Sequence, residues 1–277
     1  AFLVTGGTGG IGSALVDWLI DEQAVLPKDI VLLTRRGFSP SRGIQAIPVD
    51  CTSVEALLQC TELRGLQSVA GIFHLAGAID DAIVTNMTME RVVRAARPKA
   101  SVAAALSRLV YERDWDPEFL LNFSSTSSLF GYPGQSNYCA ANSFLDAQST
   151  WKTGESLPIV TVNWGPWAEV GMSKQGSKAY KMAIEDGDIP LRNREAFLSL
   201  SHLVRSIDSK QFAVCNVDWA KSIWKDSPLL LDLRHISIPN TESASTTSVL
   251  TEATSPSSGS EGDEDRVEAF LKSHVSS

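Results

Sequence analysis

Strand-like and helix-like stretches alternate along most of the 277-residue chain, which predicts an α/β protein. Short apolar runs, typical of buried parallel strands, are followed by stretches with apolar residues at helical spacing. The first strand and helix enclose a glycine cluster at residues 6–12. These observations predict a Rossmann-like, doubly wound parallel sheet with helices on both faces. The length suits one principal domain, expected over residues 1–235.

The chain opens with a strand, a glycine-rich turn and a helix, the arrangement of a dinucleotide-binding unit. The strand is expected at residues 1–5 and the helix at 13–20. Glycines permit the tight turn and let the backbone approach a pyrophosphate, which rests on the helix N-terminus. The cofactor contacts expected here are Thr5, Gly6, Thr8, Gly9, Gly10, Ile11 and Gly12.

The second strand, expected at residues 30–34, ends in Arg35 and Arg36. A site for NAD would carry an acid near this point to bind the ribose 2′-hydroxyl. Guanidinium groups instead suit a 2′-phosphate, because they bind phosphate oxygens through charge-assisted hydrogen bonds. The expected cofactor is therefore NADPH; two solvated surface arginines are the alternative. Third and fourth strands are expected at 44–49 and 69–74, with His74 as a packed residue.

The stretch from Phe123 to Asp146 is expected to hold the reacting groups. It follows a strand at residues 119–123 and continues through a polar loop into a helix over 136–151. This arrangement can aim the hydroxyls of Ser125 and Tyr138 into one cleft. A phenol, with a reference pKa of about 10, becomes a usable proton donor only when a cation stabilises its phenolate. Lys99, on an alanine-rich helix expected at 89–110, is the candidate cation, and 108–117 is expected to be a surface connection.

The motif Tyr138-Cys139-Ala140-Ala141-Asn142, with Ser125 upstream, resembles the ketoreductase domain of type I polyketide synthases, a branch of the short-chain dehydrogenase/reductase family. Other members of that family carry lysine where this chain has Asn142. In the polyketide branch the two residues have exchanged places, and Lys99 fits the exchanged position. The resemblance implies that Tyr138 donates a proton, Ser125 binds the carbonyl, Lys99 lowers the pKa of Tyr138, and Asn142 orients Lys99 or a relay water.

The resemblance also assigns further contacts. Asp50 and Cys51 match adenine-contacting positions, and Ala76 and Gly77 lie where the family backbone passes the cofactor. The sequence Ile79-Asp80-Asp81 resembles the Leu-Asp-Asp fingerprint of ketoreductases that form D-alcohols. The residues expected to guide the substrate are Asp81, Phe130 (which replaces a tryptophan associated with L-alcohols), Pro133 and Trp167, with Asn137 accompanying the D-type pattern. Solvated loop acids are the alternative for Asp80 and Asp81.

The function implied is NADPH-dependent reduction of a carrier-bound β-ketoacyl thioester to a D-β-hydroxyacyl thioester during polyketide chain extension. The partners implied are an acyl carrier protein domain, which presents the substrate on its phosphopantetheine arm, and neighbouring synthase domains. A fatty acid synthase reductase, a stand-alone 3-oxoacyl reductase and a non-catalytic remnant of the fold are the alternatives.

The second half of the chain is expected to complete the domain and lead into another. A strand is expected at 158–163, followed at 173–190 by a substrate lid or an ordinary loop. After it we expect a helix at 194–204, a strand at 211–217 and a closing helix from 218. Residues 236–262, rich in Ser, Thr, Glu and Pro, are expected to form a disordered linker. Residues 263–277 are expected to begin a following domain, by resemblance an acyl carrier domain.

Composition excludes several classes of function. The net charge is −8, of which residues 241–277 carry −5, so the body of the chain has no basic excess for nucleic acid. No apolar run suits a bilayer and no signal peptide opens the chain, so a cytoplasmic protein without a membrane partner is expected. Four cysteines and four histidines lie without disulfide or metal-ligand spacing, and no metal is expected. Because a strand begins at Ala1, the chain is expected to belong to a longer polypeptide.

Overall fold

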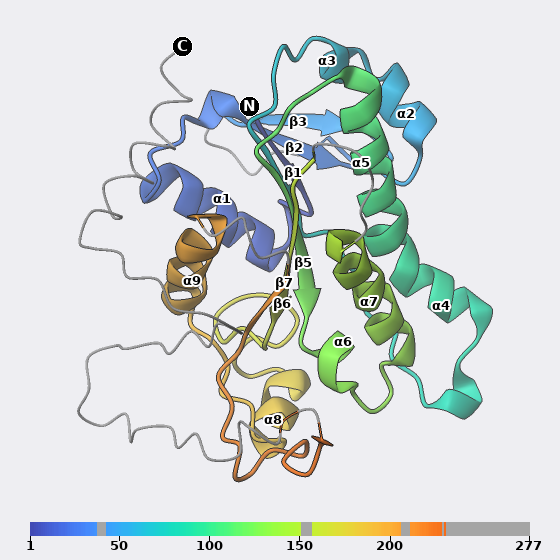
Figure 1. Ribbon diagram of the computed structural model, residues 1–277, viewed down its shortest axis with the longest axis vertical. Helices are drawn as coiled ribbons and strands as arrows, with labels where there is room; N and C mark the ends of the chain where they lie inside the picture. The colour runs from blue at the N-terminus through green and yellow to red at the C-terminus, as the bar shows by residue number, and fades with distance from the viewer. Residues whose placement is uncertain (38–42, 151–156, 206–210, 229, 231–277) are drawn as a thin grey trace.

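The computed structural model describes residues 1–37, 43–150, 157–205, 211–228 and 230 (Figure 1). Within this part of the chain, seven parallel strands form one sheet in the order β3-β2-β1-β4-β5-β6-β7. The order reverses between β1 and β4, and open α/β sheets bind ligands beyond the carboxyl ends of strands at such a point. The predicted fold is therefore confirmed. The strands are β1 (Phe2–Thr5), β2 (Ile30–Thr34), β3 (Gln45–Pro48), β4 (Gly71–His74), β5 (Phe119–Ser125), β6 (Ile159–Trp164) and β7 (Gln211–Val214).

Helices cover both faces of the sheet. In Figure 1, α1 and α9 lie on one side and α5 and α7 on the other. The helices of the described residues are α1 (Gly10–Asp21), α2 (Val54–Gln59), α3 (Thr61–Arg64), α4 (Met89–Ala96), α5 (Val102–Arg113), α6 (Ser127–Phe130), α7 (Ser136–Thr150), α8 (Lys178–Glu185) and α9 (Asn193–Arg205), with short 3-10 turns at Pro27–Asp29 and Val84–Asn86.

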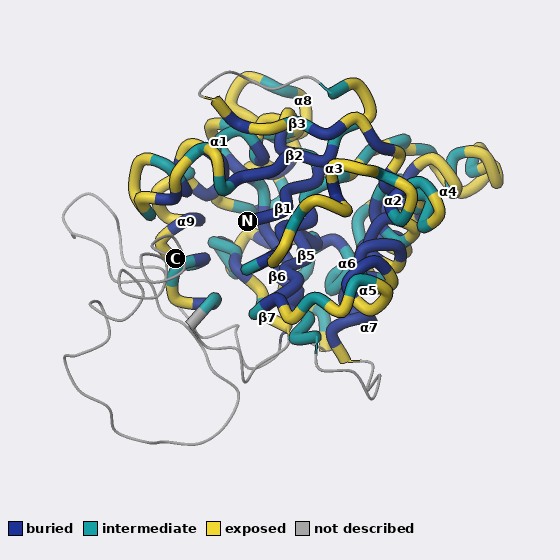
Figure 2. The backbone as a smooth tube through the Cα atoms, turned by 90° about the horizontal axis from the view of Figure 1, so that it is seen from above, coloured by how far each residue is buried: buried dark blue, intermediate teal, exposed yellow. Residues whose placement is uncertain are grey.

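The sheet separates two apolar layers because successive side chains of a strand point to opposite faces. Phe2 and Val4 of β1 pack toward α1 and α9, whereas Leu3 packs toward α2 and α5. Trp18 of α1 stacks on Phe197 of α9 with ring centroids 5.3 Å apart. The strands therefore lie buried at the centre while the outer helix faces are exposed (Figure 2). This packing fixes the carboxyl ends of the strands, where the candidate site lies.

The predicted helix over 89–110 is divided by one π-helical turn at Arg97–Ser101, between α4 and α5. Pro98 lies in this turn; a proline lacks the N–H of a regular helix and its ring clashes with the carbonyl four residues earlier, so a wider turn accommodates it. The helix then runs to Arg113, and Leu109 and Val110 are buried. The expected surface connection at 108–117 is therefore wrong over its first half, because an apolar helix face packs there.

Three other elements differ from the sequence prediction. β5 continues to Ser125, and the expected loop after it contains α6. The segment 173–190 contains α8. The chain from residue 218 forms turns instead of a closing helix, because the Ile223 N–H donates to the carbonyl of Asp186 beside α8. The segment 173–190 and these turns are thus joined through their backbones.

The predicted linker at 236–262 and following domain at 263–277 lie outside the described residues, as does the expected end of α7 at residue 151. Among the helices of the described ranges, none has the length and apolar character needed to cross a membrane.

Candidate active site

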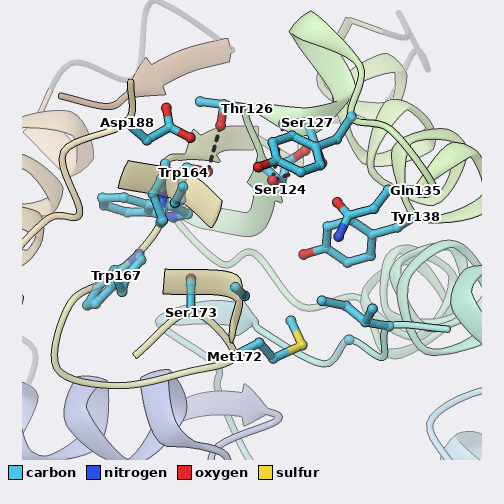
Figure 3. A pocket seen from close by; sticks show the side chains of 18 of the residues that line it. Ser124, Thr126, Ser127, Gln135, Tyr138, Trp164, Trp167, Met172, Ser173 and Asp188 are labelled. Carbon is cyan, nitrogen blue, oxygen red and sulfur yellow. Dashed lines mark hydrogen bonds between the residues drawn. The ribbon is translucent and has the colours of Figure 1, made fainter. Parts of the chain in front are cut away.

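A cavity of about 270 Å³ opens at the carboxyl ends of the central strands (Figure 3). Its walls come from segments far apart in sequence: the loops after β4 and β5, the start of α7, the segment after β6, and α8 with the turn that follows it. The sequence-predicted residues that line it are Ile11, Gly77, Asp81, Lys99, Ser125, Phe130, Pro133, Tyr138 and Trp167. The fold thus brings the predicted proton donor, carbonyl-binding serine and lysine to one cavity.

Lys99 reaches this cavity from the π-helical turn and is only 4% exposed. Its Nζ donates a hydrogen bond to the carbonyl of Phe123 at 2.9 Å and lies 5.6 Å from the centroid of the Tyr138 ring. Burial lowers the pKa of Lys99 to about 8, and the Asp146 carboxylate opposes this shift. The lysine is therefore still largely protonated at neutral pH and faces the phenol.

His74, at the end of β4, fixes the backbone that carries Lys99. Its Nε2 lies 3.1 Å from the Lys99 carbonyl oxygen and its Nδ1 lies 2.7 Å from the Thr5 hydroxyl. Because a carbonyl only accepts hydrogen bonds, Nε2 carries the proton and Nδ1 accepts from Thr5. Burial, together with the charge of Lys99, lowers the pKa of His74 to about 3. The neutral imidazole packs and positions, as expected for His74, and Thr5 faces it with its side chain.

Tyr138 is buried, and burial raises its pKa above the usual value of 10.0, although the side chains of Asn142 and Ser125 act in the opposite direction. Desolvation of the phenolate is the largest influence on this pKa, and a lowering of it by Lys99 stays a prediction. The phenol stays protonated. Ser125 Oγ accepts from the backbone N–H of Ser127 at 3.2 Å and from its hydroxyl at 2.9 Å. Its own hydrogen is thereby left for another acceptor.

Asn142 lies one helical turn after Tyr138. Its Nδ2 donates to the Tyr138 backbone carbonyl at 2.9 Å. Its Oδ1 is buried and has no hydrogen-bond partner among the described residues. Buried polar atoms are seldom left without a partner, so this oxygen is available to a water or to a Lys99 side chain that moves.

Sequence reasoning missed a buried polar cluster behind the site, formed by Asp146, Ser128 and Asn163. The Asp146 carboxylate accepts from Ser128 Oγ at 2.6 Å and from Asn163 Nδ2 at 2.9 Å. Ser128 Oγ and Asn163 Nδ2 also approach the Ser125 carbonyl, at 2.7 and 3.3 Å. The cluster therefore holds the end of β5 that carries Ser125. One signal was in the sequence: Tyr138, Asn142 and Asp146 are spaced by four and share a helix face.

The glycine turn forms a cradle with no room for side chains. Gly6 has a φ of +73°, and a Cβ on Gly12 would lie 2.2 Å from the Gly6 carbonyl oxygen. Gly9, the N-cap of α1, is exposed like Thr8 and Gly10, and no side chain caps that helix. The exposed backbone N–H groups at a helix N-terminus suit an anion. These residues fit the pyrophosphate of a dinucleotide.

The remaining predicted cofactor residues lie around this cradle. Arg35 and Arg36 are exposed directly after β2. Asp50 is exposed; its carboxylate accepts from the backbone and hydroxyl of Thr52 at 3.0 and 2.7 Å. Cys51 is buried, with a pKa raised by burial to about 12, so its thiol packs in the core and only its backbone can face a cofactor.

Ala76 and Gly77 follow β4 beside Lys99. A Cβ on Gly77 would lie 3.2 Å from Lys99 Cε, and one on Gly6 would lie 2.7 Å from the Ala76 backbone N. The backbone of this loop therefore passes directly between the glycine turn and the lysine.

The predicted substrate-guiding residues all line the cavity. Asp80 forms ion pairs with Arg91 and, at 3.1 Å, with Arg94. It is therefore not a solvated loop acid. Asp81 accepts from Gln135 Nε2 at 3.0 Å, and Asn137 Nδ2 donates to the Asp80 carbonyl at 2.9 Å. The start of α7 thus anchors the Asp80–Asp81 loop.

The two predicted aromatic guides pack differently. Phe130 lies edge-on to Trp219 with centroids 6.4 Å apart, next to Pro133 in the loop before α7. Trp167 is buried between Trp164 and Phe197, each at 5.3 Å. In the described ranges no group of three or more His, Cys, Asp and Glu side chains is placed to hold a metal ion.

A parallel sheet of this order, with a serine, a tyrosine and a lysine beyond its carboxyl ends and a glycine turn after β1, defines the class of short-chain dehydrogenases/reductases. Within that class, the family model described as the KR domain matches residues 1–169. The chain belongs to the KR domain family, an oxidoreductase family whose fold implies a nicotinamide cofactor.

The relatives are polyketide synthases. The chain is 33% identical to polyketide synthase GfsA of Streptomyces halstedii over 259 residues, which cover 86% of this chain and 3% of that protein. A solved A1-type ketoreductase is 29% identical with a TM-score of 0.68, and the match covers 79% of this chain and 48% of that one. The ketoreductase PlmKR1, from the first module of phoslactomycin biosynthesis in Streptomyces sp. HK803, is 26% identical with a TM-score of 0.71, and covers 82% and 56%. This chain therefore spans a small fraction of the curated relatives it matches and about half of these two solved ketoreductases.

Proposed function

We propose that this domain reduces a carrier-bound β-ketoacyl thioester with NADPH, giving a D-β-hydroxyacyl thioester in polyketide chain extension. The observation that carries the proposal is the meeting of Ser125, Tyr138 and Lys99 in one cavity beside the glycine cradle. An electrophilic carbonyl needs a hydrogen-bond donor and a proton donor on its oxygen, and the cavity supplies both.

The catalytic roles follow from the contacts of each side chain. A bound nicotinamide supplies the hydride. Ser125 accepts two hydrogen bonds from Ser127, which leaves its hydrogen to point at the substrate carbonyl. Tyr138 remains protonated because burial raises its pKa, and it transfers its proton to the alkoxide, a much stronger base than a phenolate. Lys99, 5.6 Å from the ring, then stabilises the phenolate, and the free Oδ1 of Asn142 holds a water or Lys99 in place.

The choice of NADPH rests on Arg35 and Arg36. Both are exposed at the end of β2, where a dinucleotide on the glycine cradle places its adenosine ribose. Asp50, Cys51, Ala76 and Gly77 form the rest of the proposed cofactor site, with backbone contact at Cys51.

The D configuration rests on the Asp81 side of the cavity. The two faces of a ketone differ only in the direction from which the chain approaches a fixed nicotinamide. Gln135 and Asn137 hold the loop of Asp81 in place. Pro133 and Phe130 also line the cavity, and Phe130 stands where a tryptophan is associated with L-alcohols. These residues support approach of the carrier arm from this side. The acyl carrier protein domain and neighbouring synthase domains are the proposed partners, since the relatives are long polyketide synthases.

Three measurements test the proposal. Fluorescence titration with NADPH separates an enzyme from a non-catalytic remnant, which would not bind the cofactor. Reduction of a β-ketoacyl thioester, presented on a carrier domain and on coenzyme A, separates a synthase domain from a stand-alone reductase. Chiral chromatography then identifies the product; a predominantly L-configured alcohol would overturn the assignment of Asp81.

A further inference from the structure

The turn after α8 places an acidic side chain, Asp188, in the cavity wall that faces Tyr138. Figure 3 shows the Asp188 carboxylate and the Tyr138 hydroxyl directed into the cavity from opposite sides. The Asp188 backbone is well fixed: its N–H donates to the Ala183 carbonyl at 2.8 Å, and it forms an antiparallel bridge with Val217. The backbone that carries this carboxylate is therefore held at a defined place in the cavity wall.

A comparison with Asp186, two residues earlier, shows what is unusual about Asp188. Asp186 accepts a hydrogen bond from the Tyr132 hydroxyl, whose ring packs beside Trp224. No described side chain donates to the Asp188 carboxylate, and the titratable groups that influence it or feel its charge are Asp186, Tyr132 and Cys215, none of them cationic. Burial, reinforced by Asp186, raises the pKa of Asp188 to about 6. At neutral pH it is thus a largely ionised, poorly solvated acceptor.

We propose that Asp188 selects β-ketoacyl chains that carry a hydroxyl group beyond the ketone; this inference rests on the proposed function. An ionised carboxylate only accepts hydrogen bonds, so the matching group must be a donor. A saturated or unsaturated hydrocarbon chain offers none, and binding it would strip water from the carboxylate without replacing it. A hydroxyl restores the lost hydrogen bond.

The geometry favours the acyl chain over the carrier arm as the source of this donor. Gln135 lies beside Tyr138 and across the cavity from Asp188 (Figure 3). It donates a hydrogen bond to Asp81, on the side from which we propose that the carrier arm approaches. An arm that enters beside Asp81 therefore directs the far end of the chain toward Asp188. The reaction that supplies such a substrate is an earlier ketoreduction whose alcohol was not dehydrated. Each extension adds two carbons, so that hydroxyl lies two carbons beyond the new ketone.

The test compares three N-acetylcysteamine thioesters: 3-oxohexanoyl, 5-hydroxy-3-oxohexanoyl and 5-methoxy-3-oxohexanoyl. The methoxy compound accepts hydrogen bonds but cannot donate one. Dissociation constants come from quenching of tryptophan fluorescence, since Trp164, Trp167 and Trp224 line the cavity, and kcat/KM comes from NADPH oxidation. We expect the hydroxylated thioester to bind about ten-fold more tightly than the other two, the lower end of what a hydrogen bond to a charged group contributes.

The variants are Asp188→Leu and the isosteric Asp188→Asn, with Glu185→Gln as the matched control. Glu185 lies at the exposed end of α8, outside the cavity lining, and its substitution removes the same charge. Asp188→Leu should bring the ratio of dissociation constants to about one, Asp188→Asn to an intermediate value, and Glu185→Gln should leave it unchanged. Equal affinities in the unmodified protein, equal preference for the methoxy compound, or a ratio that survives in both Asp188 variants would overturn the proposal. Binding is measured without cofactor, so it is independent of reduction. If the protein reduces none of the three compounds, the proposed function is refuted, and the ratio of dissociation constants still decides this inference.

Discussion

Replacing Lys99 with methionine should stabilise the folded protein while it abolishes reduction. The lysine is buried, and its pKa is lowered from 10.5 to about 8. A ten-fold change in proton affinity corresponds to about 1.4 kcal/mol, so this difference disfavours folding by about 3 kcal/mol at neutral pH. Methionine fills a similar volume without a charge. It loses the hydrogen bond to the Phe123 carbonyl, which costs about 1 kcal/mol. The expected net gain is about 1–2 kcal/mol in the free energy of unfolding.

Urea denaturation of the cofactor-free protein measures this gain, and its pH dependence identifies the cause. Because the pKa is lower in the folded state, the unfolded chain binds more protons between pH 8 and 10.5, and the contribution of Lys99 to stability rises with pH over that interval. The variant has no such rise, so its advantage should be full below pH 8 and cross zero at roughly pH 9. Near pH 10.5 the variant should be about 1 kcal/mol less stable than wild type, because only the lost hydrogen bond remains. A variant that is less stable at pH 7, or whose difference from wild type is constant over this range, would refute the reasoning. Loss of at least a hundred-fold in turnover is expected alongside.

The remaining predictions concern the other side chains of the site. Tyr138→Phe should lower turnover to less than about a hundredth while NADPH affinity by fluorescence titration is nearly unchanged, because the hydroxyl supplies a proton and little binding energy. Joint replacement of Arg35 and Arg36 by alanine should raise the KM for NADPH and leave that for NADH almost constant; equal use of both cofactors by the unmodified protein would contradict this. Asp146→Asn should move the alkaline limb of the pH–rate profile to lower pH, since the carboxylate raises the pKa of Lys99. An unmoved limb would show that Asp146 serves only to hold Ser125.

Much of the fold was predictable because parallel strands are buried on both faces. Their continuous apolar runs stand out in the sequence, and the predicted bounds of β2 match the structure. The glycine turn was predictable for a different reason: close approach of Gly6 and Gly12 excludes any side chain, so the residue type itself records the backbone geometry. The pairing of Tyr138 with Asn142 came from the resemblance of their motif to that of polyketide ketoreductases.

Features that depend on contacts between distant segments were not predictable in the same way. The helix α8 lies in a polar stretch interrupted by glycines, and the hydrogen bond from Ile223 to Asp186 replaces the helix expected after 218. Asp146 and Asn163 meet only because α7 packs against β6. The direction of the Tyr138 pKa also depended on burial, which no spacing records. Desolvation of the phenolate is the largest influence on that pKa.

The position of the lysine on a separate helix changes how the site must be built. A lysine four residues after the tyrosine would be oriented by the tyrosine's own helix, whereas Lys99 depends on three supports from other elements. The π-helical turn at Pro98 directs it inward, His74 holds its carbonyl, and the Phe123 carbonyl receives its Nζ. The position vacated on α7 then holds a neutral Asn142, and the next residue on that face is the carboxylate of Asp146. The helix α7 thus carries the proton donor Tyr138 and the carboxylate of Asp146, but not the lysine. The negative charge of Asp146 raises the pKa of Lys99, which helps to keep this buried ammonium group charged next to Tyr138.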